Sequence, residues 1–449
     1  MSKAIDKIKN IKLVKTLTNI WRIEDLRSRI LITLLFVAIY RFGSYVVLPG
    51  IDTEALEGLK NQTEGGLMSL LDMFSGGAFS KASIFALGIM PYISASIVMQ
   101  LLGIAVPYFQ KMQREGESGR RKMSQYTRYL TVPILVFQGI FYLINLKNQT
   151  AGAALYSSLD WNMFILYATI ILAAGSMFVL WLGERITDKG IGNGVSIIIM
   201  IGIIARFPTA VIQEFSTRVG GQGGLVMFLI EIVLFLAVIA AAILLVQGVR
   251  QVPVNYAKKI AGARQIGGAR QYIPLKPYAA NVMPIIFAQA IMFIPVTLAQ
   301  FSGSKLNPVV SQLIDNNSFI YNLIFAVLII LFTYLYTAIT INPVQMAEDM
   351  KRNNGFIPGI KPGKDTADYI DKVMSRITFP GSLFLAIIAI LPAFAGIFGI
   401  QREFAAFFGG TSLLILVGVV LDTLMQIESH LMMRHYDGLL DTGRVRGEH

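Results

Sequence analysis

The stretch ASIFALGIMPYISASIVMQLLGIAVPYFQ (Ala82 to Gln110) contains no charged residue, and KMQREGESGRRKMSQYTR (Lys111 to Arg128), which follows it, contains six basic ones. A helix needs about 20 mostly apolar residues to cross the hydrocarbon core of a bilayer, so the first stretch is long enough to span a membrane. The same alternation of apolar and basic stretches recurs along the chain. We therefore expect an integral membrane protein made of apolar helices.

Nine more stretches bring the expected number of transmembrane helices to ten. Three of them are weaker, because Arg41 and Glu231 interrupt two and Asp422 follows the third. We expect Arg41 and Glu231 to lie near the outer helix ends, where their side chains can reach the interface. The six stretches without charge are Tyr129 to Leu146, Trp161 to Gly183, Gly190 to Ala205, Pro277 to Ser304, Asn316 to Ala347 and Ile377 to Gln401; the weaker three are Ile30 to Leu48, Leu225 to Val246 and Phe404 to Leu421.

The basic residues are distributed unevenly between the two sides of these spans. Of the 39 Lys and Arg, 31 fall on the side of the N-terminus and only 8 on the other. Loops rich in Lys and Arg stay cytoplasmic, so we expect a multi-pass protein of the bacterial inner membrane with both termini in the cytoplasm. The net charge of +12 favours anionic lipid headgroups or a large acidic partner on that side.

The spans divide into five plus five, which suggests an inverted repeat of two halves. We expect a cytoplasmic amphipathic segment over residues 1–29, a first half over 30–218, a second half over 219–427 and a cytoplasmic tail over 428–449. We expect three long cytoplasmic loops that are basic and glycine-rich: Lys111 to Arg128 in the first half, and 250–276 and 348–376 in the second. Long ordered loops usually carry function.

The sequence lacks the signatures of an enzyme. It has no cysteine, and its three histidines lie in the C-terminal tail without metal-ligand spacing. GIKPGKDT (Gly359 to Thr366) lacks the spacing and the Ser or Thr of a phosphate loop, and GIGNG (Gly190 to Gly194) follows no strand. We therefore expect no catalytic site, no metal and no cofactor.

A secondary transporter and a passive scaffold are the alternative classes. Ion-coupled carriers usually need charged residues near the membrane midplane, and the middle of each confident span here has none. Ile89 and Ile93 instead lie one helical turn apart, as do Val195 and Ile199. Such residues could form a dry constriction, although lipid contact or packing is the commoner reason for apolar residues in a membrane helix.

The segment LMSLLDMFSGGAFS (Leu67 to Ser80) is apolar but is too short to span a membrane. It carries Asp72 and the pair Gly76 and Gly77. On length alone, it could dip into the protein from the outer side as a re-entrant half-helix, or lie on the outer surface as an interfacial helix.

Several long strings in this chain closely resemble the SecY family, the central subunits of the bacterial Sec protein-conducting channel. The resemblance runs through all ten spans in order. The strings are ASIFALGIMPYISASIVMQLL (Ala82 to Leu102), EGESGRRKMSQYTRY (Glu115 to Tyr129), WLGERITDKGIGNGVSIII (Trp181 to Ile199), VNYAKK (Val254 to Lys259), PGIKPGKDTADYIDKVMSRIT (Pro358 to Thr378) and GGTSLLILVGVVLD (Gly409 to Asp422).

The resemblance implies an all-α membrane protein whose two pseudo-symmetric five-helix halves surround an hourglass pore. The expected function is to translocate unfolded secretory polypeptides across the membrane and to release membrane segments sideways into it. An apolar ring would form the waist of the pore, from Ile89, Ile93, Val195, Ile199, Ile286 and Ile415. A short re-entrant plug helix would block it, through Leu67, Leu70, Leu71, Phe74, Gly76 and Gly77. Gly76 and Gly77 could be its hinge or a simple turn.

The family also implies a lateral gate between the second and third spans on one side and the seventh and eighth on the other. Ser94, Gln138 and Gln289 lie in these spans, and we expect Gln138 and Gln289 either to hold the gate closed or to bond their own helix backbones.

The implied partners are the SecE and SecG subunits, the SecA motor ATPase, the translating ribosome, polypeptide substrates and membrane lipids. SecA or the ribosome would dock on the basic loops. Lys361 stands where the family commonly has arginine, and Val195 where it often has isoleucine. The expected docking residues are Lys258, Lys259, Arg264, Arg270, Lys351, Arg352, Lys361 and Lys364.

Overall fold

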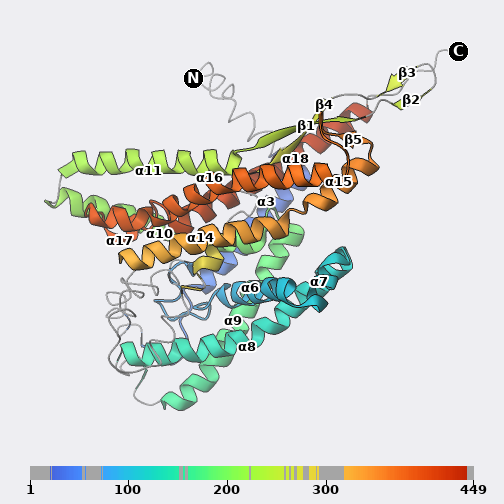
Figure 1. Ribbon diagram of the computed structural model, residues 1–449. Helices are drawn as coiled ribbons and strands as arrows, with labels where there is room; N and C mark the ends of the chain where they lie inside the picture. The colour runs from blue at the N-terminus through green and yellow to red at the C-terminus, as the bar shows by residue number, and fades with distance from the viewer. Residues whose placement is uncertain are drawn as a thin grey trace. The chain divides into compact units, whose positions relative to one another are not determined.

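A computed structural model describes residues 21, 23–52, 56, 72, 74–150, 155–156, 160–221, 224–256, 259–261, 264–266, 270–276, 283–289, 291–292 and 318–441 (Figure 1). The chain divides into two compact units. Unit 1 comprises Met1–Pro208 and Val419–His449, and unit 2 comprises Thr209–Gly418. The boundaries fall inside two long helices, α10 (Gly194–Val219) and α18 (Gly410–Asp441), so each of these contributes to both units.

Unit 1 is a bundle of long apolar helices. Helix α8 packs against α6 and α9, while α3 packs against α9 and α7 packs against α8. Leu135 and Tyr142 from α8 and Phe164 and Leu172 from α9 fill the core between them. The helices of this unit besides α10 and α18 are α3 (Glu24–Gly43), α6 (Met90–Ala105), α7 (Pro107–Arg114), α8 (Glu117–Gln149) and α9 (Trp161–Lys189).

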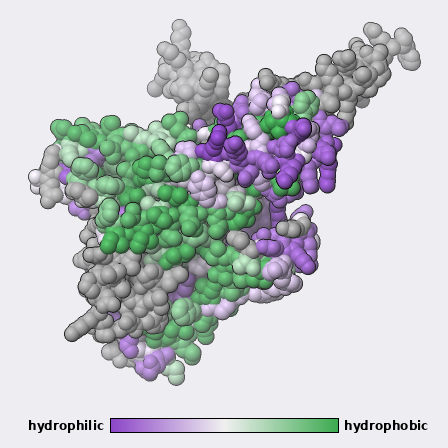
Figure 2. Space-filling view, in the orientation of Figure 1, coloured by the Kyte–Doolittle hydropathy of each residue, from purple (hydrophilic) through white to green (hydrophobic). Residues whose placement is uncertain are grey.

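Unit 2 is built around the long helix α16 (Lys364–Ile397), which packs against its neighbours α11, α14, α15 and α17. Apolar side chains cover the outer faces of α11 and α14, whereas hydrophilic ones gather at the end that carries α15 (Figure 2). Those apolar faces are the surfaces that a bilayer would cover. The bounds of the four neighbours are α11 (Gly224–Gln247), α14 (Phe319–Thr340), α15 (Pro343–Arg352) and α17 (Arg402–Ala405).

A small antiparallel sheet lies at the hydrophilic end of unit 2, where the sequence predicted only loops. Strand β1 (Arg250–Tyr256) pairs with β4 (Arg270–Leu275) on one side and with β5 (Gly355–Phe356) on the other. A second hairpin, β2 (Lys259–Ala261) with β3 (Arg264–Ile266), lies between them in the chain. The sheet therefore joins the basic loops 250–276 and 348–376, which are far apart in the sequence.

Seven helices of the described residues are long and apolar enough to cross a membrane, or eight if the bent pair α6 and α7 counts as one span. Helix α3 covers most of the weak first span and ends at Gly43, before the expected Leu48. The stretch Pro277 to Ser304 falls mostly outside the described residues. The exact count of ten therefore remains a prediction, while a mostly helical architecture with several apolar spans is confirmed.

The connection Lys111 to Arg128, expected as a loop, is helical over most of its length. Helix α7 ends at Arg114, and α8 begins at Glu117 and continues into the apolar span without a break. Gly116 separates the two helices with a φ of 76°, a conformation that glycine adopts readily. The prediction was wrong here because polarity shows where a helix leaves the hydrocarbon, not where it ends.

Candidate functional site

The expected ring residues of unit 1 lie at the starts of two helices. Ile89 is the N-cap residue of α6, and the amide of Ile93 donates to the Ile89 carbonyl at 3.1 Å. Val195 and Ile199 occupy the first turns of α10. Ile89 and Ile199 are buried, whereas Ile93 and Val195 are half-buried. Ile286 and Ile415 belong to unit 2, where Ile286 is half-buried and Ile415 is buried. Closure of the ring remains a prediction.

The GIGNG turn fixes the start of α10 through its backbone amides. The amide of Ile191 donates to Thr33 Oγ1 at 3.1 Å, that of Gly192 to Gln426 Oε1 at 2.8 Å and that of Gly194 to Thr187 Oγ1 at 2.9 Å. These bonds tie the turn to α3, α18 and α9. The amides that a nucleotide phosphate would need are thus occupied by side chains, and their role is to position α10.

The C-terminal part of the expected plug is a compact set of turns. Gly76 and Gly77 have φ values of +66° and +87°, and the Gly77 amide donates to the Asp72 carbonyl at 2.8 Å. Asp72 Oδ1 accepts from the Ser80 amide at 2.7 Å, which closes the segment on itself. Phe74 is half-buried. Leu67, Leu70 and Leu71 lie outside the described residues, so a plug helix over them remains a prediction.

This segment packs directly against the helices that carry the ring residues. A Cβ placed on Gly202 of α10 would lie 2.5 Å from the Phe74 carbonyl oxygen, and one on Gly88 would lie 4.0 Å from Ser75 Cβ. Gly202 is three residues after Ile199, on the same face of α10, and Gly88 directly precedes Ile89. The segment therefore lies next to ring residues of both α6 and α10.

Two arginines and two tyrosines of unit 1 also hold this segment. Arg206 of α10 forms an ion pair with Asp72, and Arg41 Nη1 of α3 donates to the Gly76 carbonyl at 3.1 Å. Tyr40 Oη donates to the Ser75 carbonyl at 3.3 Å, and Tyr142 Oη of α8 to the Phe79 carbonyl at 2.8 Å. We expected Arg41 to reach the membrane interface, and the structure adds that its guanidinium contacts this segment.

Two of the three expected gate residues contact each other. Gln138 Nε2 of α8 donates to Ser94 Oγ of α6 at 3.4 Å, and both side chains are half-buried. Gln138 therefore bonds a neighbouring helix of its own unit, an arrangement that neither expectation included. Gln289 belongs to unit 2, where it is buried. Its expected role in the gate remains a prediction.

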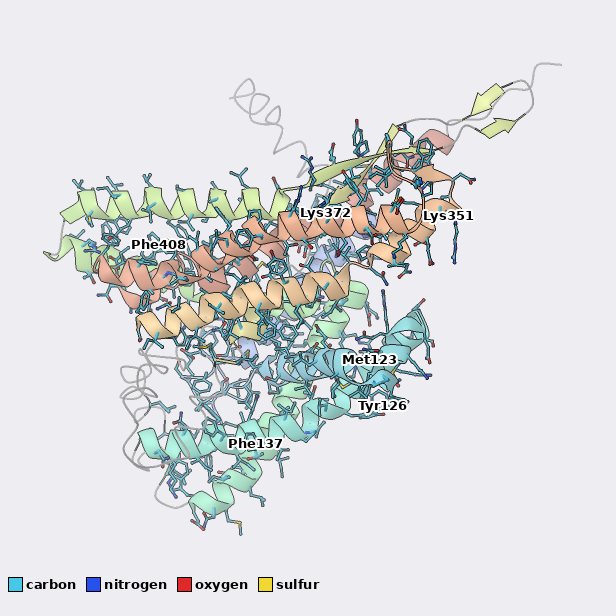
Figure 3. The ribbon with its side chains drawn as sticks, viewed as in Figure 1. Met123, Tyr126, Phe137, Lys351, Lys372 and Phe408 are labelled. Atoms are coloured by element: carbon cyan, nitrogen blue, oxygen red, sulfur yellow. The ribbon has the colours of Figure 1, made fainter. Side chains whose placement is uncertain are left out.

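The two basic loops share one hydrophobic core. Val254 from β1, Met350 from α15 and Ile370 from α16 pack together with Leu275 and Ile357, all of them buried. On this core, Lys351, Arg352, Lys361 and Lys364 are exposed. Lys351 of α15 and Lys372 of α16 are labelled in Figure 3. Lys258 and the side chains of Lys259, Arg264 and Arg270 lie outside the described residues.

Glu231 corrects a further expectation, because it does not reach the interface but is buried in a cluster of charges. Arg218 contacts Glu231 Oε1 at 2.6 Å and Glu214 Oε1 at 2.8 Å, and it donates to the Gly399 carbonyl at 2.9 Å. The Gln401 amide donates to Glu214 Oε2 at 2.9 Å. The cluster joins α10 and α11 to the connection before α17, near the phenylalanines that include Phe408 (Figure 3).

Within the described residues, no group of His, Cys, Asp or Glu side chains is arranged to hold a metal ion.

The comparisons with known proteins agree with one another. The SecY family model matches residues 83–424. The protein translocase subunit SecY of Halalkalibacterium halodurans is 42% identical over 435 residues, which cover 95% of this chain and 99% of that protein. A solved structure described as showing that the SecY plug domain stabilises the closed translocation channel has a TM-score of 0.62 at 17% identity, covering 94% and 95% of the two chains. Sec61 from the canine ribosome-channel complex has a TM-score of 0.58 at 15% identity, covering 94% and 95%.

Proposed function

Because this chain belongs to the SecY family, we propose that it forms the channel through which a translocase moves unfolded secretory polypeptides across the membrane. Membrane segments of those polypeptides leave the channel sideways into the bilayer. The near full-length match to a translocase subunit carries this proposal. None of the comparisons favours a secondary transporter.

The pore does not select a polypeptide by its sequence. Aliphatic side chains offer no hydrogen bonds that would hold a particular sequence, so Ile89, Ile93, Val195, Ile199, Ile286 and Ile415 impede ions and water but admit many chains. Val195 has one methylene less than isoleucine and leaves slightly more room. The contacts of the plug segment with Gly202 and Gly88 support this assignment, since both lie beside ring residues.

The lateral gate opens for apolar segments because its polar contacts are weak. An interhelical hydrogen bond in a membrane is worth about 0.6 kcal/mol, with a maximum near 1.7. The Gln138–Ser94 bond holds α6 and α8 together as one wall of the gate. Gln289, which is buried in unit 2, is the third polar residue that we assign to the gate.

The joined basic loops form the docking surface for the partners that drive transport. The surface lies over a buried core that includes residues of α15 and α16, so a movement of a bound partner can be passed to these helices. Its exposed basic residues are Lys351, Arg352, Lys361 and Lys364. A polyanionic ribosomal RNA or an acidic face of SecA would bind there. Hydrolysis of ATP or GTP belongs to these partners. SecE and SecG complete the assembly within the bacterial cytoplasmic membrane, with both termini of this chain in the cytoplasm.

The test is reconstitution of the full chain with SecE into proteoliposomes, followed by SecA, ATP and a labelled secretory precursor. We expect ATP-dependent protection of the precursor from added protease. A precursor with a defective signal sequence is the control. Absence of protection, with SecA demonstrably bound, would contradict the proposed function.

A further inference from the structure

We propose that Asp72, Arg206 and Arg41 form an electrostatic latch that sets how often the plug leaves the closed position. The latch consists of the Asp72–Arg206 ion pair and the hydrogen bond from Arg41 to the Gly76 carbonyl. This inference rests on the proposed function, since it assigns residues that regulate the resting state of the same channel.

The latch residues Arg206 and Arg41 belong to two helices that contact the plug segment, α10 and α3. Ile199, Gly202 and Arg206 follow one another at intervals of three and four residues, so they lie on one face of α10. One face therefore supplies an expected ring residue, the surface on which the plug rests and the cation that holds it. Arg41 holds the next turn of the plug from a different helix, α3.

Burial makes the ion pair sensitive to loss of either partner. The Asp72 side chain is only 3% exposed and that of Arg206 is 20% exposed. A buried pair contributes little net stability against an apolar equivalent, but removing one partner leaves a charge that is poorly solvated. Ser80 fixes the carboxylate by donating its amide to Oδ1, so Oδ2 remains directed at Arg206.

The ion pair acts only while the plug is close to α10. Its attraction is strong only while water is excluded, and salt screens it beyond about 8 Å at physiological ionic strength. Once the plug has moved by that distance, both charges are hydrated and the latch exerts little force.

Resting ion leak through proteoliposomes that contain the full chain and SecE tests the latch. Asp72→Asn keeps an oxygen for the Ser80 amide and removes only the charge, while Arg206→Gln removes the cation. We expect each to raise the leak about tenfold or more, since either substitution removes the attraction that holds the plug, and Arg206→Gln also leaves the buried Asp72 carboxylate without this cation. Arg206→Lys should restore most of the seal, and the double variant should leak no more than the worse single one.

Arg121→Gln is the matched control, because Arg121 also pairs with an acidic residue but is 78% exposed. Gly202→Ala tests the packing of the plug on α10 without changing any charge: its Cβ would meet the Phe74 carbonyl oxygen, so the leak should also rise. Gly396→Ala is its control, because nothing lies within 4 Å of a Cβ there.

The same vesicles receive SecA, ATP and precursor, so that the two proposals can fail separately. Unchanged leak in Asp72→Asn and Arg206→Gln, in vesicles that translocate normally, would overturn the latch and leave the channel standing. If the Asp72 and Arg206 variants do not assemble, an unchanged leak in Arg41→Gln, which removes the other contact of the latch, would overturn it instead. Wild-type vesicles that never translocate would overturn the proposed function, whatever their leak.

Discussion

Arg218 is the cation of a buried charge cluster in unit 2. Its guanidinium contacts the carboxylates of Glu214 and Glu231, and all three side chains are buried. We predict that Arg218→Gln lowers the free energy of unfolding by about 3–5 kcal/mol, because two buried carboxylates then lose their cation. Unfolding of the purified protein in detergent, followed by circular dichroism, measures this.

The exposed pair Arg121–Glu117 provides the comparison for that prediction. Arg121→Gln should change the unfolding free energy by at most about 1 kcal/mol, since exposed ion pairs are worth little. Equal effects of the two substitutions would show that the buried cluster is not a structural centre of unit 2.

A second prediction at the scale of residues concerns the bond between Gln138 and Ser94. We predict that Gln138→Leu and Ser94→Ala each change the export of a defective-signal precursor about threefold, which corresponds to ~0.6 kcal/mol for one interhelical hydrogen bond. The double variant should match the single ones, because either substitution removes the same bond. Export that is unchanged in all three, or effects that multiply in the double variant, would contradict this role.

Among the elements, the sheet that joins the two basic loops has the most direct consequence for partners. We predict that Lys351→Glu combined with Arg352→Glu weakens SecA or ribosome binding to reconstituted vesicles, and that raised salt weakens wild-type binding in the same direction. Lys361→Arg should strengthen binding severalfold, because a guanidinium can contact a phosphate or carboxylate through two hydrogen bonds. Cosedimentation measures both effects.

Lys147→Glu is the control for charge alone, because Lys147 is exposed at the opposite end of the long helix α8 from the basic stretch. Binding that falls equally in this variant would mean that net charge, rather than the joined loops, attracts the partner.

The long helices of this fold could be predicted from the sequence, whereas the sheet could not. Apolar length predicted the long helices, such as α9 and α16, because the cost of burying charge in hydrocarbon is a local property of the chain. It did not predict β1 and β5, since their pairing joins loops that are distant in the sequence. The cluster around Arg218 was missed for the same reason.

The candidate site was predicted unevenly. The GIGNG turn and the isoleucines near it lie within one recognisable string, so their positions at the start of α10 followed from the resemblance. Arg206 was missed because the expected span ended one residue before it. Its spacing of seven residues from Ile199 could have placed it on the ring face, but nothing in the sequence pairs it with Asp72.

At the scale of the whole molecule, we propose that a polypeptide passes through the middle of this chain, between the expected ring residues. The plug segment contacts the helices that carry four of these residues, and two further ones belong to unit 2. Such a path requires that a translocating chain touch the expected ring residues, which are buried or half-buried, and avoid isoleucines that face lipid.

The most direct measurement replaces Ile89, Ile199 or Ile286, one at a time, with a photo-crosslinking residue and arrests a precursor during SecA-driven transport. Ile170, which is 64% exposed on α9, is the matched control. We predict that the precursor crosslinks to all three expected ring positions and not to Ile170. Protected precursor that crosslinks to Ile170, or to none of the ring positions, would contradict a path through the centre of this chain.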